Sequence, residues 1–405
     1  MRILIIEEAL REDTGHWPAY IGTLARGLRA SGDEVDILGH TDCGRQLCAV
    51  LRVNPVLRAN CWLDTQYQGT LGGMKHSQVY RSDIRTWLEQ APGYDWILVL
   101  TTRLQHLLAW TRLITGGERM KGARLLLLFV QGFGRYESMR QAVYFPTTMS
   151  TLIARSCFHL LSPWVSTGKV HLGAETVAMQ RELSLFSKLP VKVFPHPVSA
   201  AGIPKERAVR GDEPVVNCPG LARYEKGSAL LRQALNLAMG REGLARVRFI
   251  VQWKEGFDLP DGKTVGAPPE WVGHPRITLV RDNLAAEDFF QLLLASDLVL
   301  LPYRREAYHN RLSRIAIEAA IIGRPVLYTR GTAIAELMEV GAAGVALEDE
   351  SADAIIRGLE RAVADFEALA KAAVAAVPRV REHHSVATFR GGLIRLAGHP
   401  LPCVH

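Results

Sequence analysis

Short apolar runs alternate with segments of helical period along this chain, and the alternation occurs twice. In the first half the expected strands are residues 2–6, 34–38, 94–100, 124–130, 160–161 and 191–194. In the second half they are residues 214–218, 247–252, 277–280, 298–301 and 326–328. Strands that alternate with helices predict a parallel sheet covered by helices on both faces. The sequence therefore predicts an α/β fold of two Rossmann-like, doubly wound domains that face a cleft.

The segment 200–213 separates the two runs, because it mixes Gly, Pro and charged residues without any apolar period. A chain of 405 residues that is 48% hydrophobic is also long for a single core. We expect an N-terminal domain over 1–198 and a C-terminal domain over 199–378. Residues 379–405 are expected to form a helix and tail that pack back on the N-terminal domain.

Composition excludes several classes of protein. A net charge of +7 spread over the whole chain does not indicate a nucleic-acid partner, but it fits anionic ligands or a negatively charged membrane surface. The longest apolar runs have strand length and are far too short to span a bilayer. The opening MRILIIEE predicts a strand and not a signal peptide. The six cysteines form no CxxC pair and no grouping with His at metal-ligand spacing, which indicates reduced cytosolic thiols and no metal site.

A first candidate site lies in the loop that follows the strand 214–218. This loop has the sequence GLARYEKG, from Gly220 to Gly227. Its glycines allow a tight backbone turn, and Arg223 and Lys226 place two cations before the next helix. Helix amino ends attract anions, so the loop is expected to bind phosphate.

A second candidate site follows the strand 298–301, where a loop leads to an expected helix from Arg311 to Ile322. Arg311 and Ser313 at the helix start are placed to hold a phosphate, although a simple helix cap is the alternative. Glu318 lies in the apolar stretch IAIEAAII. A buried carboxylate without a partner is costly, so Glu318 is expected to accept hydrogen bonds from a sugar hydroxyl.

The two loops together predict a pocket for a diphosphate. The leaving group of a nucleotide-sugar is a diphosphate, and fixed cations and backbone amides can stabilise its developing charge without a metal. A nucleotide-diphosphate sugar is therefore the expected substrate, and no metal or other cofactor is expected.

Residues 214–347 resemble the retaining glycosyltransferases of family 4, also called glycosyl transferases group 1. The resemblance is carried by Gly-x-x-Arg-x-Glu-Lys-Gly from Gly220, by LVLLPY from Leu298, and by Glu318-Ala319 followed by Gly-x-Pro-Val from Gly323. It implies a GT-B fold and sugar transfer with retention of anomeric configuration. It also implies that Arg223 and Lys226 hold the donor diphosphate and that Glu318 binds the ribose.

Two positions depart from the pattern of that family. The family typically has Glu eight residues before the position of Glu318, where this chain has Asn310. Many relatives carry His where this chain has Gln131, after the strand 124–130. An amide at 310 can bond sugar hydroxyls but offers no negative charge to an oxocarbenium-like transition state, and Gln131 cannot act as a base. The resemblance implies that the departing phosphate itself helps to deprotonate the acceptor.

The acceptor side is expected in the N-terminal half. Gly15 and His16 resemble the first acceptor-side loop of the family, and Gln131 follows a strand at the same edge. The expected acceptor is a glycan or a lipid-linked glycan, in the synthesis of surface polysaccharide. A basic protein of this kind is expected in the cytoplasm, peripherally at the inner face of the membrane.

Two other functions remain open from the sequence. Asn310 and Gln131 favour a catalytically inactive nucleotide-sugar-binding partner of an active transferase. A nucleotide-sugar epimerase could share the two-domain architecture. A dinucleotide oxidoreductase is disfavoured, because no G-x-G-x-x-G follows the first strand.

Overall fold

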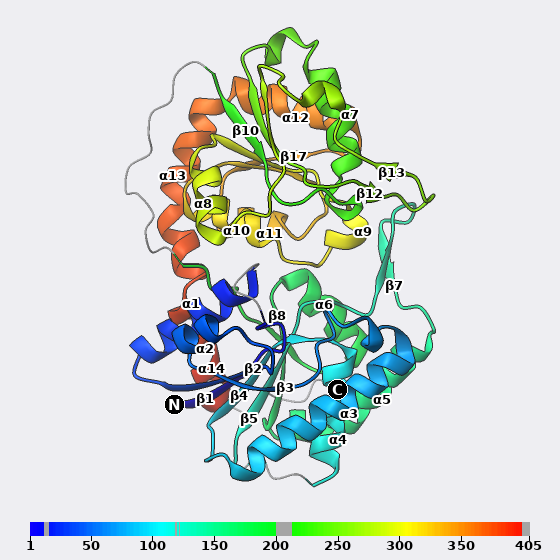
Figure 1. The fold of residues 1–405 in the computed structure, drawn as a ribbon, viewed down its shortest axis with the longest axis vertical. Coiled ribbons are helices and arrows are strands. Elements are labelled where there is room, and N and C mark those ends of the chain that lie inside the picture. Colours follow the sequence, from blue (N-terminus) through cyan, green and yellow to red (C-terminus); the bar gives the residue numbers. More distant parts are fainter. Residues whose placement is uncertain (12–15, 118–119, 121, 200–212, 399–405) are drawn as a thin grey trace. The chain divides into compact units, whose positions relative to one another are not determined.

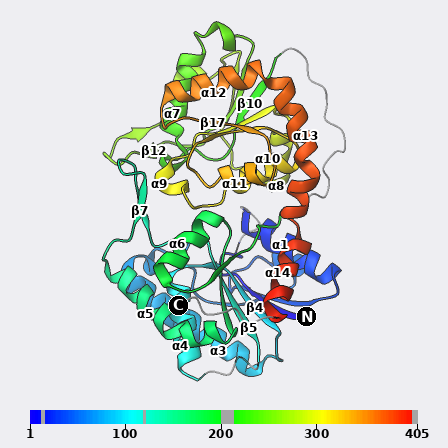
Figure 2. The ribbon, with the colours of Figure 1, turned by 180° about the vertical axis from the view of Figure 1, so that it is seen from behind.

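The computed structural model describes residues 1–11, 16–117, 120, 122–199 and 213–398. The chain forms two compact units, seen from two sides in Figures 1 and 2. Unit 1 comprises Met1–Pro197 together with Ser385–His405, and unit 2 comprises Val198–His384. Across the described ranges, the model has no helix with the length and apolar character that a membrane span requires.

Unit 1 contains a seven-stranded parallel sheet in the order β3-β2-β1-β4-β5-β8-β9. Its strands are β1 Arg2–Ile6, β2 Glu34–His40, β3 Val53–Leu57, β4 Trp96–Thr102, β5 Arg124–Phe129, β8 Val170–Ala174 and β9 Val191–Val193. A separate hairpin joins β6 Arg135–Glu137 and β7 Ala142–Tyr144. The helices are α1 His16–Ala30, α2 Arg45–Leu51, α3 Gly69–Gln90, α4 Leu104–Thr115, α5 Met149–Ser166, α6 Val177–Ser187 and α14 Val386–Gly398.

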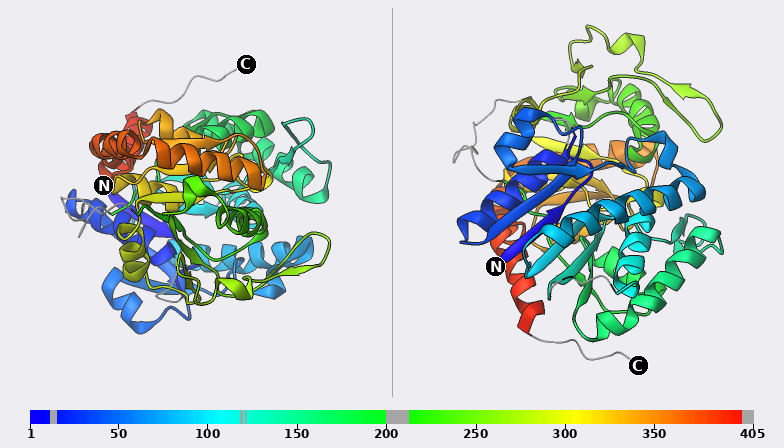
Figure 3. Two further views of the ribbon diagram at one scale, coloured as in Figure 1. Left: turned by 90° about the horizontal axis from the view of Figure 1, so that it is seen from above. Right: turned by 60° about the horizontal axis from the view of Figure 1, so that its bottom comes forward.

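Both faces of this sheet are buried, as the near-continuous apolar strands predict. Along β1, Ile3 and Ile5 join one core cluster, whereas Leu4 and Ile6 join another. The first cluster includes Phe389 of α14, and α14 packs against α1 (Figure 3). The last helix therefore completes the sheet packing of unit 1.

Unit 2 contains a six-stranded parallel sheet in the order β14-β11-β10-β15-β16-β17. Its strands are β10 Val215–Cys218, β11 Arg248–Gln252, β14 Ile277–Val280, β15 Leu298–Leu301, β16 Val326–Thr329 and β17 Gly344–Leu347. A two-stranded ribbon joins β12 Phe257–Asp258 and β13 Thr264–Val265. The helices are α7 Ser228–Ala238, α8 Ala286–Leu294, α9 Arg305–Tyr308, α10 Arg314–Ile321, α11 Ala335–Glu339, α12 Ala352–Ala364 and α13 Phe366–His383. The expected pair of parallel-sheet α/β units is confirmed.

Three local predictions are wrong. Residues 160–161 are not a strand but lie inside α5, which the Thr148 side chain caps by accepting from the Thr151 amide. Gly323 does end α10, but that helix starts at Arg314 and not at Arg311. The helix expected within residues 379–405 does not start directly after Pro378, because α13 runs through Pro378 to His383 and α14 begins at Val386. In each case a side-chain cap or tertiary packing overrides the local sequence signal.

Candidate functional site

The loop after β10 is shaped by two glycines in the left-handed region. Gly220 has φ +89° and its amide donates to Oε1 of Gln252 at 2.7 Å. Gly227 has φ +70°, and a Cβ at that position would collide with the carbonyl oxygen of Pro302. Glycine is the residue that tolerates both the positive φ and the close approach. The sequence pattern of this loop therefore has a direct steric cause.

The two candidate loops of unit 2 meet, because β10 and β15 are neighbouring parallel strands. The carboxyl ends of such strands lie at the same edge of the sheet. The Arg304 amide donates to the carbonyl of Glu225 at 3.0 Å, and its guanidinium lies 4.5 Å from the centre of the Tyr224 ring. Backbone and side-chain contacts thus join the second loop to the first.

The half-buried Lys226 lies near two further cations, Arg223 and Arg311. Burial, the charge of Arg223 and the charge of Arg311 lower the pKa of Lys226 to about 8, although Glu225 acts in the opposite direction. Arg223 lies 3.7 Å from Glu225. No ion pair with a carboxylate is found for Lys226 or Arg311 within the described part of the chain. Like charges held together in this way are suited to an anionic ligand.

Arg311 lies in the loop before α10, and its guanidinium is 5.2 Å from the centre of the Tyr308 ring. Ser313 is the N-cap of α10, and its Oγ accepts from the Ala316 amide at 3.3 Å. The cap that the sequence allowed as an alternative is therefore present for Ser313. Asn310, directly before Arg311, is buried with 4% of its surface exposed.

Glu318 has a structural partner, contrary to the reason for which the sequence singled it out. Its Oε1 accepts from Nε of Arg314 at 2.8 Å, one helical turn earlier. This ion pair explains how a carboxylate is accommodated on an otherwise apolar helix. The pair joins Arg314 to Oε1, and no hydrogen bond to Oε2 is found within the described residues.

The expected acceptor residues belong to unit 1. Gly15 lies outside the described residues, and His16 begins α1. Gln131 follows β5 and is exposed at the wall of a cavity of about 290 Å³. The other lining residues are Gly69, Thr70, Gly73, Met74, Arg103, Leu104, Gln105, Leu108, Gly132, Phe133, Ser150 and Ile153.

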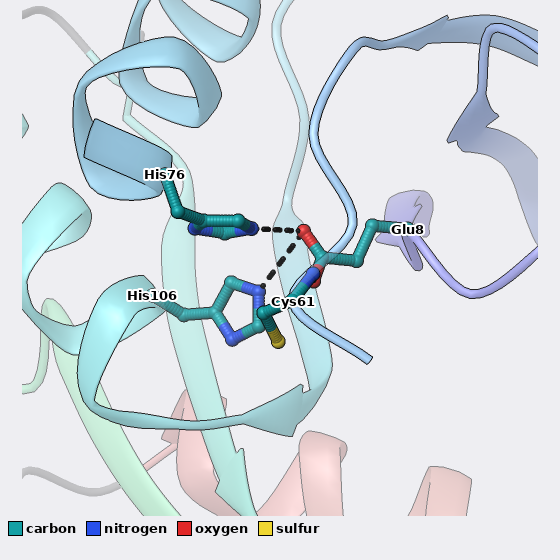
Figure 4. A group of neighbouring side chains, drawn as sticks. All are labelled: Glu8, Cys61, His76 and His106. Atoms are coloured by element: carbon teal, nitrogen blue, oxygen red, sulfur yellow. Dashed lines mark hydrogen bonds and ion pairs between the residues drawn. The ribbon is translucent and has the colours of Figure 1, made fainter. Parts of the chain in front are cut away.

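A buried cluster in unit 1 was not predicted. Glu8, Cys61, His76 and His106 place one possible ligand atom each within 4.8 Å of the others (Figure 4). Nε2 of His76 lies 2.7 Å and Nε2 of His106 lies 3.4 Å from Oε2 of Glu8. The four residues are far apart in the sequence, so no spacing rule could reveal the group. Cys61 thus lies beside two histidines in three dimensions, although no cysteine groups with histidine at metal-ligand spacing in the sequence.

Such a donor set could hold a transition metal. Hydrogen bonds already engage most of its polar atoms, but Nδ1 of His76 has no hydrogen-bond partner among the described residues. The Arg103 amide donates to Nδ1 of His106 at 3.1 Å, so Nε2 of that ring carries the proton and donates to Glu8. The Cys61 amide donates to Oε1 of Glu8 at 2.7 Å. Burial alone would raise the pKa of Glu8, but contacts with His106 and His76 hold it well below its usual range. The cluster is therefore an ionised carboxylate enclosed by donors from several elements.

Solved structures of other proteins share the fold of this chain. No family model and no curated protein matches the chain. Similar solved structures include sucrose-phosphate synthase from Thermosynechococcus elongatus, at 15% identity and a TM-score of 0.64, covering 98% of both chains. HepE of Anabaena with UDP and glucose has 16% identity and a TM-score of 0.58, again over 98% of both chains.

The catalytic domain of starch synthase IV from Arabidopsis thaliana, bound to ADP and acarbose, is also similar. It has 11% identity and a TM-score of 0.64, covering 98% of this chain and 99% of that one. These identities carry information about fold and not about activity. The two parallel-sheet units of this chain form the fold of the GT-B glycosyltransferases.

Proposed function

We propose that this protein is a retaining glycosyltransferase of family 4 that uses a nucleotide-diphosphate sugar. The observation that carries the proposal is the group of Arg223, Lys226 and Arg311, in which Lys226 is half-buried and forms no ion pair with a carboxylate of the described residues. A diphosphate would neutralise this group, and the three cations would stabilise the negative charge that develops on the diphosphate as the sugar departs. The fold supports the same conclusion, since similar structures hold UDP or ADP.

The donor site is proposed to divide as follows. Backbone amides around Gly220, with Arg223 and Lys226, hold the diphosphate. Arg311 adds charge at its other side, while Ser313 acts through the N-terminus of the helix that it caps. Oε2 of Glu318 accepts from the ribose.

Asn310 is proposed to bond hydroxyls of the transferred sugar. It carries no charge, so the departing phosphate serves as the group that takes the acceptor proton. Transfer then proceeds with retention and needs no metal, because the cations of the loop supply the positive charge.

The acceptor is proposed to be a glycan or a lipid-linked glycan that binds unit 1 near Gly15, His16 and Gln131. The cavity beside Gln131 supports this placement. We place the protein in the cytoplasm, peripherally at the inner face of the membrane, where a net charge of +7 favours anionic lipid. Surface polysaccharide synthesis is the process that fits these assignments.

A second candidate is a catalytically inactive nucleotide-sugar-binding partner, which Asn310 and Gln131 favour. The test is a transfer assay with uridine- and adenosine-diphosphate sugars on a panel of glycan and lipid-linked acceptors, with the product anomer assigned by NMR. We expect a product with the anomeric configuration of the donor. Donor binding without turnover on any acceptor would favour the partner protein, and an epimer formed from donor alone would indicate an epimerase.

A further inference from the structure

The cavity beside Gln131 has a single charged wall residue. Among the residues that line it, Arg103 alone is ionisable at neutral pH, and no Asp or Glu faces it. The guanidinium of Arg103 lies 4.6 Å from the centre of the Trp62 ring. No ion pair joins it to any carboxylate among residues 1–11, 16–117, 120, 122–199 and 213–398. The cavity therefore contains a cation without a counter-ion.

Arg103 is held in place by the buried cluster of Glu8, Cys61, His76 and His106. Its NH1 group donates to the carbonyl oxygen of Cys61 at 3.4 Å, and its amide donates to Nδ1 of His106. Glu8 fixes both of these residues, through the Cys61 amide and through Nε2 of His106. The ionised carboxylate thus orients the arginine without forming an ion pair with it.

Three helices begin at this cavity. Gly69 and Thr70 open α3, Leu104 and Gln105 open α4, and Ser150 is the second residue of α5. Helix amino ends carry partial positive charge and amides without intrahelical partners. Their convergence on the side of Arg103 gives the cavity a field that favours an anion.

Besides Arg103 and the polar side chains of Thr70, Gln105, Gln131 and Ser150, the wall contains apolar side chains, and further apolar side chains lie outside it. Leu104, Leu108, Phe133 and Ile153 line the cavity together with Met74. Beside lining residues of α3 and α5, Leu71 is 83% exposed and Met149 is 62% exposed. Exposed apolar residues grouped around a pocket mark a binding surface. A ligand with only a charged group would leave this surface uncovered.

We infer that the cavity binds an amphiphilic anion, in which a phosphate or carboxylate contacts Arg103 and an attached apolar chain lies along α3 and α5. The inference rests on the proposed function, since it names the chemical class of the acceptor. The acceptor is then a lipid phosphate or a similar amphiphile, whose anionic group is bound by unit 1, whereas unit 2 binds the donor diphosphate. Glu8 and His106 are positioning residues for Arg103.

Isothermal titration of the full chain tests this inference with octyl phosphate below its micelle-forming concentration. Inorganic phosphate and octyl glucoside serve as the charge-only and chain-only probes. We expect octyl phosphate to bind about tenfold more tightly than either probe, and Arg103→Gln to lose about tenfold in affinity. Ser150→Glu, which adds a negative charge at the cavity, is expected to do the same. Arg112→Gln removes a charge from the same helix outside the cavity and is expected to bind as wild type.

Each other outcome overturns the inference. If octyl phosphate and octyl glucoside bind equally well, the cavity does not recognise the anionic group. If inorganic phosphate binds as tightly as octyl phosphate, the cavity does not recognise the apolar chain. If Arg103→Gln and Ser150→Glu both bind octyl phosphate with unchanged affinity, the cavity is not its binding site. Binding to anionic vesicles that neither variant alters would lead to the same conclusion. Titration of UDP on the same samples separates the two proposals: UDP binding without octyl phosphate binding refutes only this one, and absence of both refutes the donor site as well.

Discussion

The charged groups of the two units are arranged in opposite ways. In unit 2, burial and the charges of Arg223 and Arg311 lower the pKa of Lys226, and no carboxylate among the described residues forms an ion pair with it. In unit 1, Glu8 is surrounded by donors, so its pKa is lowered because its charge is stabilised. The uncompensated charges of unit 2 lower the free energy of unfolding, and a bound anionic ligand can raise it again. The hydrogen-bonded carboxylate of unit 1 stabilises the fold. We therefore expect a ligand to bind at the charged group that the protein itself does not neutralise.

The largest expected effect comes from removing the stabilised charge. Glu8→Ala leaves the Cys61 amide and two imidazoles without their acceptor, so we expect a loss of about 3 to 5 kcal/mol in the free energy of unfolding. Lys226→Ala, by contrast, is expected to leave the free energy of unfolding unchanged or to raise it, because a repelled charge is removed. Urea denaturation measures both. If Lys226→Ala lowers the free energy of unfolding as much as Glu8→Ala does, the proposed difference between the two charged groups is wrong.

The backbone of the unit 2 loop is expected to be the next most sensitive feature. Gly227→Ala combines a positive φ with a collision against the Pro302 carbonyl, so it should cost about 2 to 3 kcal/mol and abolish diphosphate binding. Gly262→Ala is the matched control, because Gly262 also has a positive φ, of +82°, but its Cβ would meet no atom within 4 Å. Similar losses from both variants, by urea denaturation, would show that the collision is unimportant.

Two adjacent carboxylates of unit 1, Glu7 and Glu8, have pKa values that are shifted in opposite directions. Burial and the charge of Glu8 raise the pKa of Glu7 to about 8, although the Ala9 amide and Thr101 act in the opposite direction. Among the described residues, Oε2 of Glu7 has no hydrogen-bond partner. Glu7 then stays protonated in the folded state while the unfolded state ionises above about 4.5. The free energy of unfolding should therefore fall by about 1.4 kcal/mol per pH unit between these values on account of Glu7.

Glu7→Gln should remove that fall, as measured by urea denaturation across the pH range. The contribution of Glu8 has the opposite sign, because a depressed pKa stabilises above the unfolded value and is lost as the pH drops toward the folded one. Identical pH profiles of wild type and Glu7→Gln would contradict the assignment of a protonated Glu7.

The lowered pKa of Lys226 predicts a smaller effect on ligand affinity. A diphosphate binds the charged lysine, so affinity for UDP should weaken by up to about tenfold per pH unit above pH 8. Lys226→Arg keeps the charge at all these values, and its affinity should not change with pH in that window. Titration calorimetry from pH 7 to 10 makes the measurement, and a wild-type affinity that is flat across it would show that Lys226 is not in contact with the ligand.

The sequence predicted the sheets better than the sites. Fully buried parallel strands such as β4 and β5 are apolar runs, so their period and length identify them directly. β3 was missed because Pro55 interrupts an edge strand. The loop from Gly220 to Gly227 was predictable, because local backbone geometry demands its glycines.

The remaining features depend on contacts between distant parts of the chain. Glu8, Cys61, His76 and His106 come from four separate segments, and only packing brings them together. The cavity at Arg103 likewise forms where the starts of three helices meet. Glu318 was singled out for the lack of a partner, yet its partner Arg314 lies four residues away. That pair could have been recognised from the sequence by its i, i+4 spacing.

The cations around Lys226 in unit 2 are expected to bind a nucleoside diphosphate. A thermal-shift measurement with UDP and ADP on wild type, Lys226→Ala and Glu318→Ala tests it most directly. We expect at least one nucleotide to raise the Tm of wild type, Lys226→Ala to lose the shift, and Glu318→Ala to reduce it. No shift in wild type with either nucleotide, or equal shifts in wild type and both variants, would contradict the account.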